Sequence, residues 1–271
     1  TCVIMNLLKF TELTPLEQVE KARRETYISL KRHEKRILKK MDKKDKEIKK
    51  NLIINFSPSE FAFGFEGCKK CYYDKKINKL ELKSFFPPIF NTFDRIQKRF
   101  FHGKSSKEVD QNLEEGTIIA DYERIIRTKV LYDKKNRPFT MSGKIDAYIK
   151  HKNSFSVIDF KTTNINPNKI KTYETQLQSY AFMLENSDEK SLKLSPIKGL
   201  GILCFEPNNI TNKNSDLVKM DWDTKWYPID VIVDHKKIID YVTTIQDFLF
   251  ENENPQSSNN CNVCNFFKNK E

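Results

Sequence analysis

Two pairs of cysteines constrain this chain more than any other feature of the sequence. They form the C-x-x-C motifs Cys68–Cys71 and Cys261–Cys264, which bracket most of the chain. This spacing allows two thiolates to bind one metal, and two such motifs supply the four ligands of a Zn²⁺ site or an iron–sulfur cluster. Because metal ligation then contributes to folding, the sequence predicts a metal lobe that joins two distant segments.

A disulfide framework is the competing explanation for these cysteines, and the rest of the sequence disfavours it. No stretch approaches the roughly 18 consecutive apolar residues of a membrane span, and the chain does not open with a secretion signal. We therefore expect a cytoplasmic protein without a membrane partner, in which the thiols bind metal. Cys204, in an apolar segment, is interpreted as an inert core thiol.

The formal net charge of +11 on these 271 residues is concentrated near the beginning of the chain. Between Lys21 and Lys50 there are 14 Lys and Arg residues but 5 Asp and Glu residues. The sequence Thr14-Pro15-Leu16-Glu17 has the capping-box pattern that starts a helix, which we expect to run to about Lys50. We predict a basic helical arm over residues 1–50, which either contacts a phosphate backbone or is simply solvated. Residues 51–271 are predicted to form the main domain.

The central part of the chain predicts two strands that carry charged residues. Residues 140–149 and 156–162 alternate between apolar and polar side chains, which is typical of half-buried strands. Asp159 and Lys161 are two positions apart, so their side chains lie on one face of the second strand. A carboxylate and an ammonium are thus presented side by side.

The length of the turn between these strands decides whether Asp146 joins them. A two-residue turn, or a four-residue loop, places Asp146 directly across from Asp159 and Lys144 across from Lys161. A three-residue turn would move Asp146 to the opposite face. We predict the even-numbered turn.

Two neighbouring carboxylates repel each other unless a hard cation lies between them, and Mg²⁺ prefers such ligands together with water and phosphate oxygens. This is an arrangement suited to phosphodiester cleavage, in which Asp146 and Asp159 would bind Mg²⁺ and Lys161 could orient the attacking water or stabilise the developing negative charge. The competing interpretation is a surface strand with weak ion pairs.

An amphipathic helix is predicted over residues 168–185, where apolar residues recur at helical spacing. Gln176 and Tyr180 lie four residues apart and share one face of it, from which they could reach a nucleic acid or the metal-bound water. Alternatively, Tyr180 is a core residue and Gln176 lies at its boundary. Further helices are predicted over residues 89–101 and 235–250, a strand over 201–205 and a surface loop over 208–216.

The order Gly143-x-x-Asp146, Ile158-Asp159-Phe160-Lys161 and Gln176-x-x-x-Tyr180 resembles the PD-(D/E)XK nuclease superfamily, and its last part resembles the Q-x-x-x-Y motif of the RecB-like branch. The resemblance covers about residues 57–267. It implies an α/β restriction-endonuclease-like fold, with a central mixed sheet flanked by helices. It also implies that Asp146 and Asp159 bind Mg²⁺ or Mn²⁺ and that Lys161 assists the attacking water. Gln176 and Tyr180 would support substrate or metal.

The cysteines resemble those of RecB-like nucleases that hold a [4Fe–4S] cluster, including recombination-helicase-associated and CRISPR-adaptation nucleases. Those proteins combine one early cysteine with a late group of three, whereas this chain has two pairs, so Zn²⁺ remains an alternative. The family's G-x-x-x-H motif is absent before Arg127. Asp94 or His102 could supply a further ligand, but both are interpreted as residues of a helix surface or helix end.

The sequence as a whole predicts a metal-dependent DNA nuclease with a structural metal site formed by Cys68, Cys71, Cys261 and Cys264. The expected partner is DNA, single-stranded or at ends, with a helicase or a recombination, repair or CRISPR protein as a further candidate. The preference for DNA comes from the resemblance alone, and exonuclease and endonuclease action both remain open. The alternative is a non-catalytic nucleic-acid-binding module with the same fold. A small-molecule or redox enzyme that uses the cysteines is disfavoured, because the 7 glycines form neither a phosphate-binding loop nor a dinucleotide-binding motif.

Overall fold

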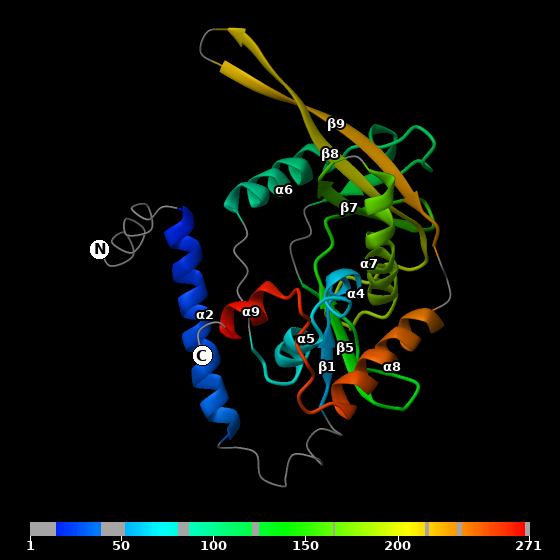
Figure 1. The fold of residues 1–271 in the computed structure, drawn as a ribbon. Coiled ribbons are helices and arrows are strands. Elements are labelled where there is room, and N and C mark those ends of the chain that lie inside the picture. The colour runs from blue at the N-terminus through cyan, green and yellow to red at the C-terminus, as the bar shows by residue number, and fades with distance from the viewer. Residues whose placement is uncertain are drawn as a thin grey trace, which may run out of the picture. The chain divides into compact units, whose positions relative to one another are not determined.

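The computed structural model describes residues 15–38, 52–80, 87–120, 125–164, 166–214, 217–231 and 235–268. The chain divides into two compact units (Figure 1). One unit comprises residues 1–50, 67–87 and 248–271, and the other comprises residues 51–66 and 88–247. The first unit contains the cysteine pairs, and the second contains the predicted carboxylate pair. Among the helices of the described residues, none combines the length and the apolar character that crossing a bilayer requires.

The described residues of the first unit form three helices besides the end of α8. They are α2 (Pro15–Leu38), α5 (Lys69–Lys76) and α9 (Asn262–Lys268). Helix α2 begins at Pro15, as the capping-box sequence predicts, and its described side chains are exposed or half-buried. The predicted continuation of this helix toward Lys50 lies outside the described residues.

The second unit is built around a five-stranded mixed sheet. Its strand order is β2-β6-β7-β8-β9, and β7 pairs antiparallel with β6 and parallel with β8. The strands are β2 (Thr117–Ile119), β6 (Ala147–Lys150), β7 (Phe155–Thr162), β8 (Ile197–Asn214) and β9 (Leu217–Ile229). The strand that carries Asp159 and Lys161 is therefore central in the sheet.

A four-stranded sheet completes the strand framework of this unit. Strand β5 pairs with all three of the others, parallel to β1 and antiparallel to β3 and β4. The strands are β1 (Ile54–Phe56), β3 (Ile126–Arg127), β4 (Leu131–Tyr132) and β5 (Pro138–Gly143). This arrangement corrects the prediction of one continuous strand over residues 140–149. Because Gly143 pairs with Ile126 and Ala147 pairs with Ile158, the chain passes from one sheet to the other in between, and Lys144 lies outside the β6–β7 ladder.

Helices flank the sheets, as the sequence predicts. They are α4 (Pro58–Phe63), α6 (Pro88–Phe101), α7 (Pro167–Glu185) and α8 (Lys236–Glu251), with a 3₁₀ turn at Ser106–Glu108. Phe101 at the end of α6 packs with Phe160 of β7 and Phe205 of β8, at ring-centroid distances of 5.7 and 6.0 Å. Since side chains alternate along a strand, Asp159 and Lys161 face away from this aromatic core.

The predicted surface loop over residues 208–216 is wrong for residues 208–214, and residues 215–216 lie outside the described residues. Strand β8 continues to Asn214 and pairs with β9, for example through Ile210↔Met220 and Thr211↔Lys219. Figure 1 shows this pair, in yellow and orange, extending well beyond the helices α6 and α7. Asparagine and lysine have low β-propensity, but the backbone hydrogen bonds of the ladder override that preference here.

Candidate functional site

Strand β7 presents a carboxylate and an ammonium side by side. Asp159 is buried, and its Oδ2 atom forms an ion pair with Lys161 Nζ at 2.5 Å. The ammonium of Lys161 also lies 5.0 Å from the centroid of the Tyr173 ring on α7. The predicted common face of Asp159 and Lys161 is therefore the face that meets α7.

The register of the hairpin brings Asp146 to the same place. Ala147 pairs with Ile158 and Lys150 pairs with Phe155, and the His151 N–H donates to the Ser154 carbonyl at 3.0 Å. This is a two-residue turn, one of the two even-numbered connections considered from the sequence, and it confirms the predicted register. Asp146 directly precedes β6, and its Oδ2 accepts a hydrogen bond of 2.9 Å from the Phe160 backbone N–H.

The two carboxylates influence each other electrostatically. Burial raises the pKa of Asp159 to about 7, and the charge on Asp146 adds to this effect, although Lys161 opposes it. A buried carboxylate that meets a second negative charge is stabilised in its ionised form by any cation placed between them. The electrostatics of this pair therefore favour a bound cation.

A second lysine, which the sequence did not point to, neutralises the carboxylate of Asp146. Lys98 of α6 lies 3.1 Å from Asp146 Oδ1 and 3.0 Å from Asp94 Oδ2. Burial lowers the pKa of Lys98, but the charges of Asp146 and Asp94 outweigh burial and raise this pKa. Gln97, the preceding residue, donates to Thr162 Oγ1 at 3.0 Å and so fastens this part of α6 to β7. The Lys98 ammonium therefore links Asp94 to Asp146, because it pairs with both carboxylates.

Gln176 and Tyr180 join the same cluster from α7. Both are buried, and Gln176 Nε2 donates to the Tyr180 hydroxyl at 3.2 Å. Burial raises the pKa of Tyr180, and the charges of Asp159 and Asp146 raise it further, which keeps this phenol protonated. Within the described part of the chain, the buried Gln176 Oε1 has no hydrogen-bond partner. The five residues predicted for the site therefore lie together.

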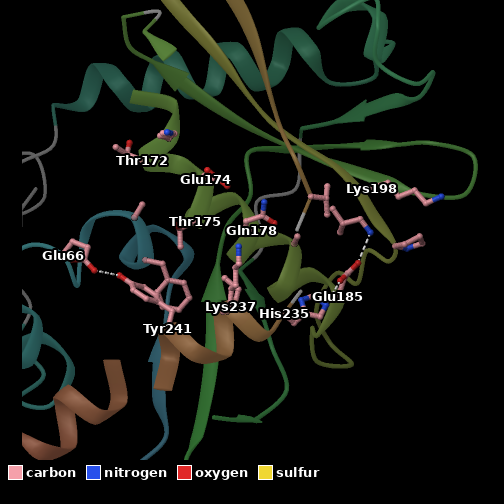
Figure 2. Close-up of a pocket in the computed structure, with 18 residues that line it drawn as sticks. Glu66, Thr172, Glu174, Thr175, Gln178, Glu185, Lys198, His235, Lys237 and Tyr241 are labelled. Carbon is pink, nitrogen blue, oxygen red and sulfur yellow. Dashed lines mark hydrogen bonds and ion pairs between the residues drawn. The ribbon is translucent and has the colours of Figure 1, made fainter. Parts of the chain in front are cut away.

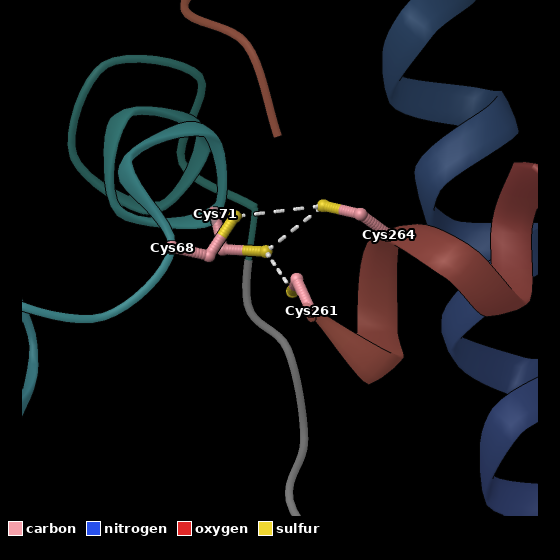
Figure 3. A group of neighbouring side chains, drawn as sticks. All are labelled: Cys68, Cys71, Cys261 and Cys264. Atoms are coloured by element: carbon pink, nitrogen blue, oxygen red, sulfur yellow. Dashed lines mark hydrogen bonds between the residues drawn. The ribbon is translucent and has the colours of Figure 1, made fainter. Parts of the chain in front are cut away.

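The four motif cysteines also lie together, in the first unit (Figure 3). Their Sγ atoms are all within 4.8 Å of one another. Burial raises the pKa of Cys264 to about 12 and also raises that of Cys71, and neighbouring sulfurs contribute to both shifts. In Cys68, burial raises the pKa, but hydrogen bonds from backbone N–H groups and from the other motif's cysteines together outweigh it and lower the pKa to about 7. Four crowded thiols of this kind ionise together only when a cation compensates their charge.

A comparison with protein-family models decides which family these features belong to. The model of the PD-(D/E)XK nuclease superfamily matches residues 93–267, which include all the carboxylate-site residues and the second cysteine pair. The chain belongs to the PD-(D/E)XK nuclease superfamily. The restriction-endonuclease-like α/β fold predicted from the sequence is thereby confirmed, and membership indicates a metal-dependent nuclease at the level of the superfamily.

Two further comparisons do not bear on the function of this chain. A solved structure described as "Crystal structure of SSO0001" is similar to this chain at 13% identity and a TM-score of 0.42, covering 85% of this chain and 88% of that one. A search of the curated proteins found no significant match.

The carboxylate site fits the divalent cation that the superfamily implies. Asp159 on β7 and Asp146, directly before β6, would supply carboxylate oxygens, and the unpartnered Gln176 Oε1 is a third oxygen nearby. Mg²⁺ and Mn²⁺ bind through one or two carboxylates and keep several waters, so a small number of protein ligands suffices. Lys98 and Lys161 hold these carboxylates through ion pairs.

His102 has a structural contact at the end of α6. Its Nδ1 atom accepts a hydrogen bond of 3.3 Å from the Ala120 backbone N–H. This contact agrees with the interpretation of His102 as a helix-end residue.

A separate pocket of about 720 Å³ lies between α4, α7, α8 and the start of β8 (Figure 2). The Tyr241 hydroxyl donates to Glu66 Oε1 at 3.1 Å on one side, and His235 lies 3.2 Å from Glu185 on another. On α7 the pocket is lined by residues such as Thr175 and Gln178, which lie on a different face of the helix from Gln176 and Tyr180. The pocket is therefore not part of the carboxylate site.

Proposed function

We propose that this protein is a metal-dependent DNA nuclease of the RecB-like branch, in which Asp146 and Asp159 bind Mg²⁺ or Mn²⁺. The observation that carries the proposal is the hairpin register, because it places Asp146 beside Asp159 while Lys161 shares the face of Asp159. The Q-x-x-x-Y pair supports the assignment to the RecB-like branch, since its hydroxyl and amide lie beside the same carboxylates.

The residues of the site have distinct roles in the proposed reaction. A bound divalent cation would lower the pKa of a water molecule and neutralise charge on the scissile phosphate. Lys161 is held against Asp159, and its charged ammonium orients the attacking water and stabilises the negative charge that develops on the phosphate. Because the Tyr180 phenol stays protonated, it donates hydrogen bonds, and Gln176 fixes its direction.

DNA is proposed as the substrate from the resemblance to RecB-like nucleases, and the charge distribution supports a polyanion. The net charge of +11 and the cluster of lysines and arginines in residues 21–50 favour contacts with a phosphate backbone. Such contacts release condensed counterions, so cleavage should fall steeply as the salt concentration rises. A helicase or a recombination, repair or CRISPR protein is proposed as a partner on the resemblance alone.

The test uses the full chain, purified anaerobically, with linear end-labelled and circular DNA in single- and double-stranded form. We expect cleavage with Mg²⁺ or Mn²⁺ by the natural protein, and none by Asp146→Asn. Asp221→Asn, an exposed carboxylate on β9, is the matched control and should cleave normally. Cleavage of circles identifies an endonuclease, whereas digestion of linear DNA alone identifies an exonuclease.

The second candidate function is a nucleic-acid-binding module that lacks catalysis. It is favoured by the ion pairs of Lys98 and Lys161, which already neutralise the two carboxylates without a metal. A folded protein that binds DNA but cleaves none of the substrates with either metal would establish this alternative.

A further inference from the structure

The distances between the four cysteine sulfurs are specific enough to distinguish one metal centre from another. Cys71 Sγ lies 3.4 Å from Cys264 Sγ and 3.6 Å from Cys261 Sγ, and Cys68 Sγ lies 3.7 Å from Cys264 Sγ. All three distances join one C-x-x-C motif to the other, and no pair of the four sulfurs exceeds 4.8 Å. They are far longer than a disulfide bond, and the four thiols are free.

The two motifs have equivalent local structures. Cys68 directly precedes α5 and Cys261 directly precedes α9, so in each motif the second cysteine lies in the first turn of a helix. In both cases the carbonyl of the first cysteine accepts an i→i+4 hydrogen bond, from Tyr72 at 3.0 Å and from Asn265 at 2.9 Å. Each turn therefore presents two sulfurs in one direction, and the two turns face each other (Figure 3).

A single tetrahedral ion matches these distances. With a metal–sulfur bond of about 2.3 Å, tetrahedral geometry places the ligand sulfurs about 3.8 Å apart. In a [4Fe–4S] cluster each thiolate binds a different iron, so the cysteine sulfurs lie roughly 6 Å apart. In a [2Fe–2S] cluster, cysteines on different irons lie roughly 5 Å or more apart. The contacts of 3.4 to 3.7 Å link all four sulfurs, and no pair exceeds 4.8 Å, so no division of these cysteines between two irons fits.

We propose that Cys68, Cys71, Cys261 and Cys264 bind one structural Zn²⁺ ion, and that the iron–sulfur cluster implied by the RecB-like resemblance does not fit this chain. Four protein thiolates leave no open position, which is typical of structural zinc sites. At such a site Zn²⁺ binds more strongly than Fe²⁺. The Ser258 backbone N–H donates to Cys68 Sγ at 3.4 Å, as expected of an outer contact that orients a ligand thiolate. This inference concerns the first unit alone and holds whether or not the protein cleaves DNA.

The direct test is metal analysis of the full chain, produced with both iron and zinc in the medium and purified without oxygen so that any cluster survives. We expect a colourless protein with about one zinc per chain and no acid-labile sulfide. A brown protein with several irons and equivalent sulfide would overturn the proposal. A red protein with a single iron would also overturn it.

X-ray absorption at the zinc edge tests the ligands without any substitution. Four sulfur neighbours at about 2.3 Å are expected, and nitrogen or oxygen neighbours in their place would refute the four-cysteine site.

Cys264→Ser should lose the zinc, or hold it with three sulfurs if the serine oxygen replaces the thiolate. Cys204→Ala, which removes the buried thiol of β8, is the control and should keep one zinc per chain. Retention of four sulfur neighbours in Cys264→Ser would contradict the assignment.

Discussion

The carboxylate site and the cysteine cluster differ in how the chain compensates their charge. At the carboxylates, lysines from α6 and β7 already pair with Asp146 and Asp159, at 3.1 and 2.5 Å. At the cysteines, the described contacts of the sulfurs are with one another and with backbone N–H groups. We therefore expect the first site to fold without a metal, and the second to need its proposed metal in order to be stable.

The difference between the two sites predicts that a metal has a different role at each of them. Asp159 lies on the central strand of a sheet with its own aromatic core, and Asp146 directly precedes the neighbouring strand β6. We therefore expect the geometry of this pair not to depend on a ligand. The cysteine pairs lie in short segments that are remote in sequence, and a shared ion would link them. We expect loss of the first metal to affect catalysis and loss of the second to affect folding.

The largest effect is expected from Asp159→Asn. The amide keeps the shape of the side chain but removes a negatively charged ligand, so cleavage should fall by about 10³-fold or more. Circular dichroism should still report a folded protein, with unchanged zinc content. Cleavage within tenfold of the natural protein would show that Asp159 is not a metal ligand.

Cys71→Ser should affect folding stability and zinc content rather than catalysis. Because Cys71 contacts two sulfurs of the other motif, its loss should release the zinc and lower the melting temperature by about 5–10 °C. Hydrogen exchange should localise the loss of protection to residues 68–80 and 261–268. If zinc content and melting temperature stayed unchanged, the proposed stabilising role of the cluster would be wrong.

A smaller effect is expected at Lys98, whose ammonium competes with a divalent cation for Asp146. Lys98→Met should strengthen Mn²⁺ binding about fivefold, because the competing ion pair of 3.1 Å is removed. Electron paramagnetic resonance measures the free Mn²⁺ directly and needs no DNA. Lys104→Met, which removes a lysine paired with Glu108 instead, is the control and should leave the affinity unchanged. Weaker binding in Lys98→Met would mean that this lysine supports the metal site.

The smallest effect is expected from Tyr180→Phe. Loss of one hydroxyl hydrogen bond should lower kcat about 2- to 4-fold and leave KM unchanged. Single-turnover cleavage at saturating DNA measures this step. An unchanged rate would indicate that the Gln176 and Tyr180 pair only packs in the core.

The local parts of this account could be predicted from the sequence. The turn at Lys152-Asn153 fixed the β6–β7 register, and helical spacing placed α6, α7 and α8 within one or two residues of their ends. These features depend on neighbours in sequence, which pattern and turn chemistry report well.

The features that could not be predicted from the sequence depend on contacts between segments that are distant in the chain. Lys98 lies on a helix four residues after Asp94, a spacing that predicts a surface ion pair, and nothing local indicates its contact with Asp146. Likewise, the passage of the chain between sheets at residues 144–146 depends on Ile126, which pairs with Gly143. The strand over residues 208–214 depends on its ladder with β9 in the same way.

The most direct test of the two-metal account is DNA cleavage by the natural protein when Mg²⁺ is removed and restored while zinc is monitored. Dialysis into a mild chelator should abolish cleavage, with zinc content and melting temperature unchanged. Addition of Mg²⁺ or Mn²⁺ alone should then restore it. Cleavage that persists without Mg²⁺, or that never appears in a zinc-loaded, folded protein after Mg²⁺ is added, would contradict the proposed division between the two sites.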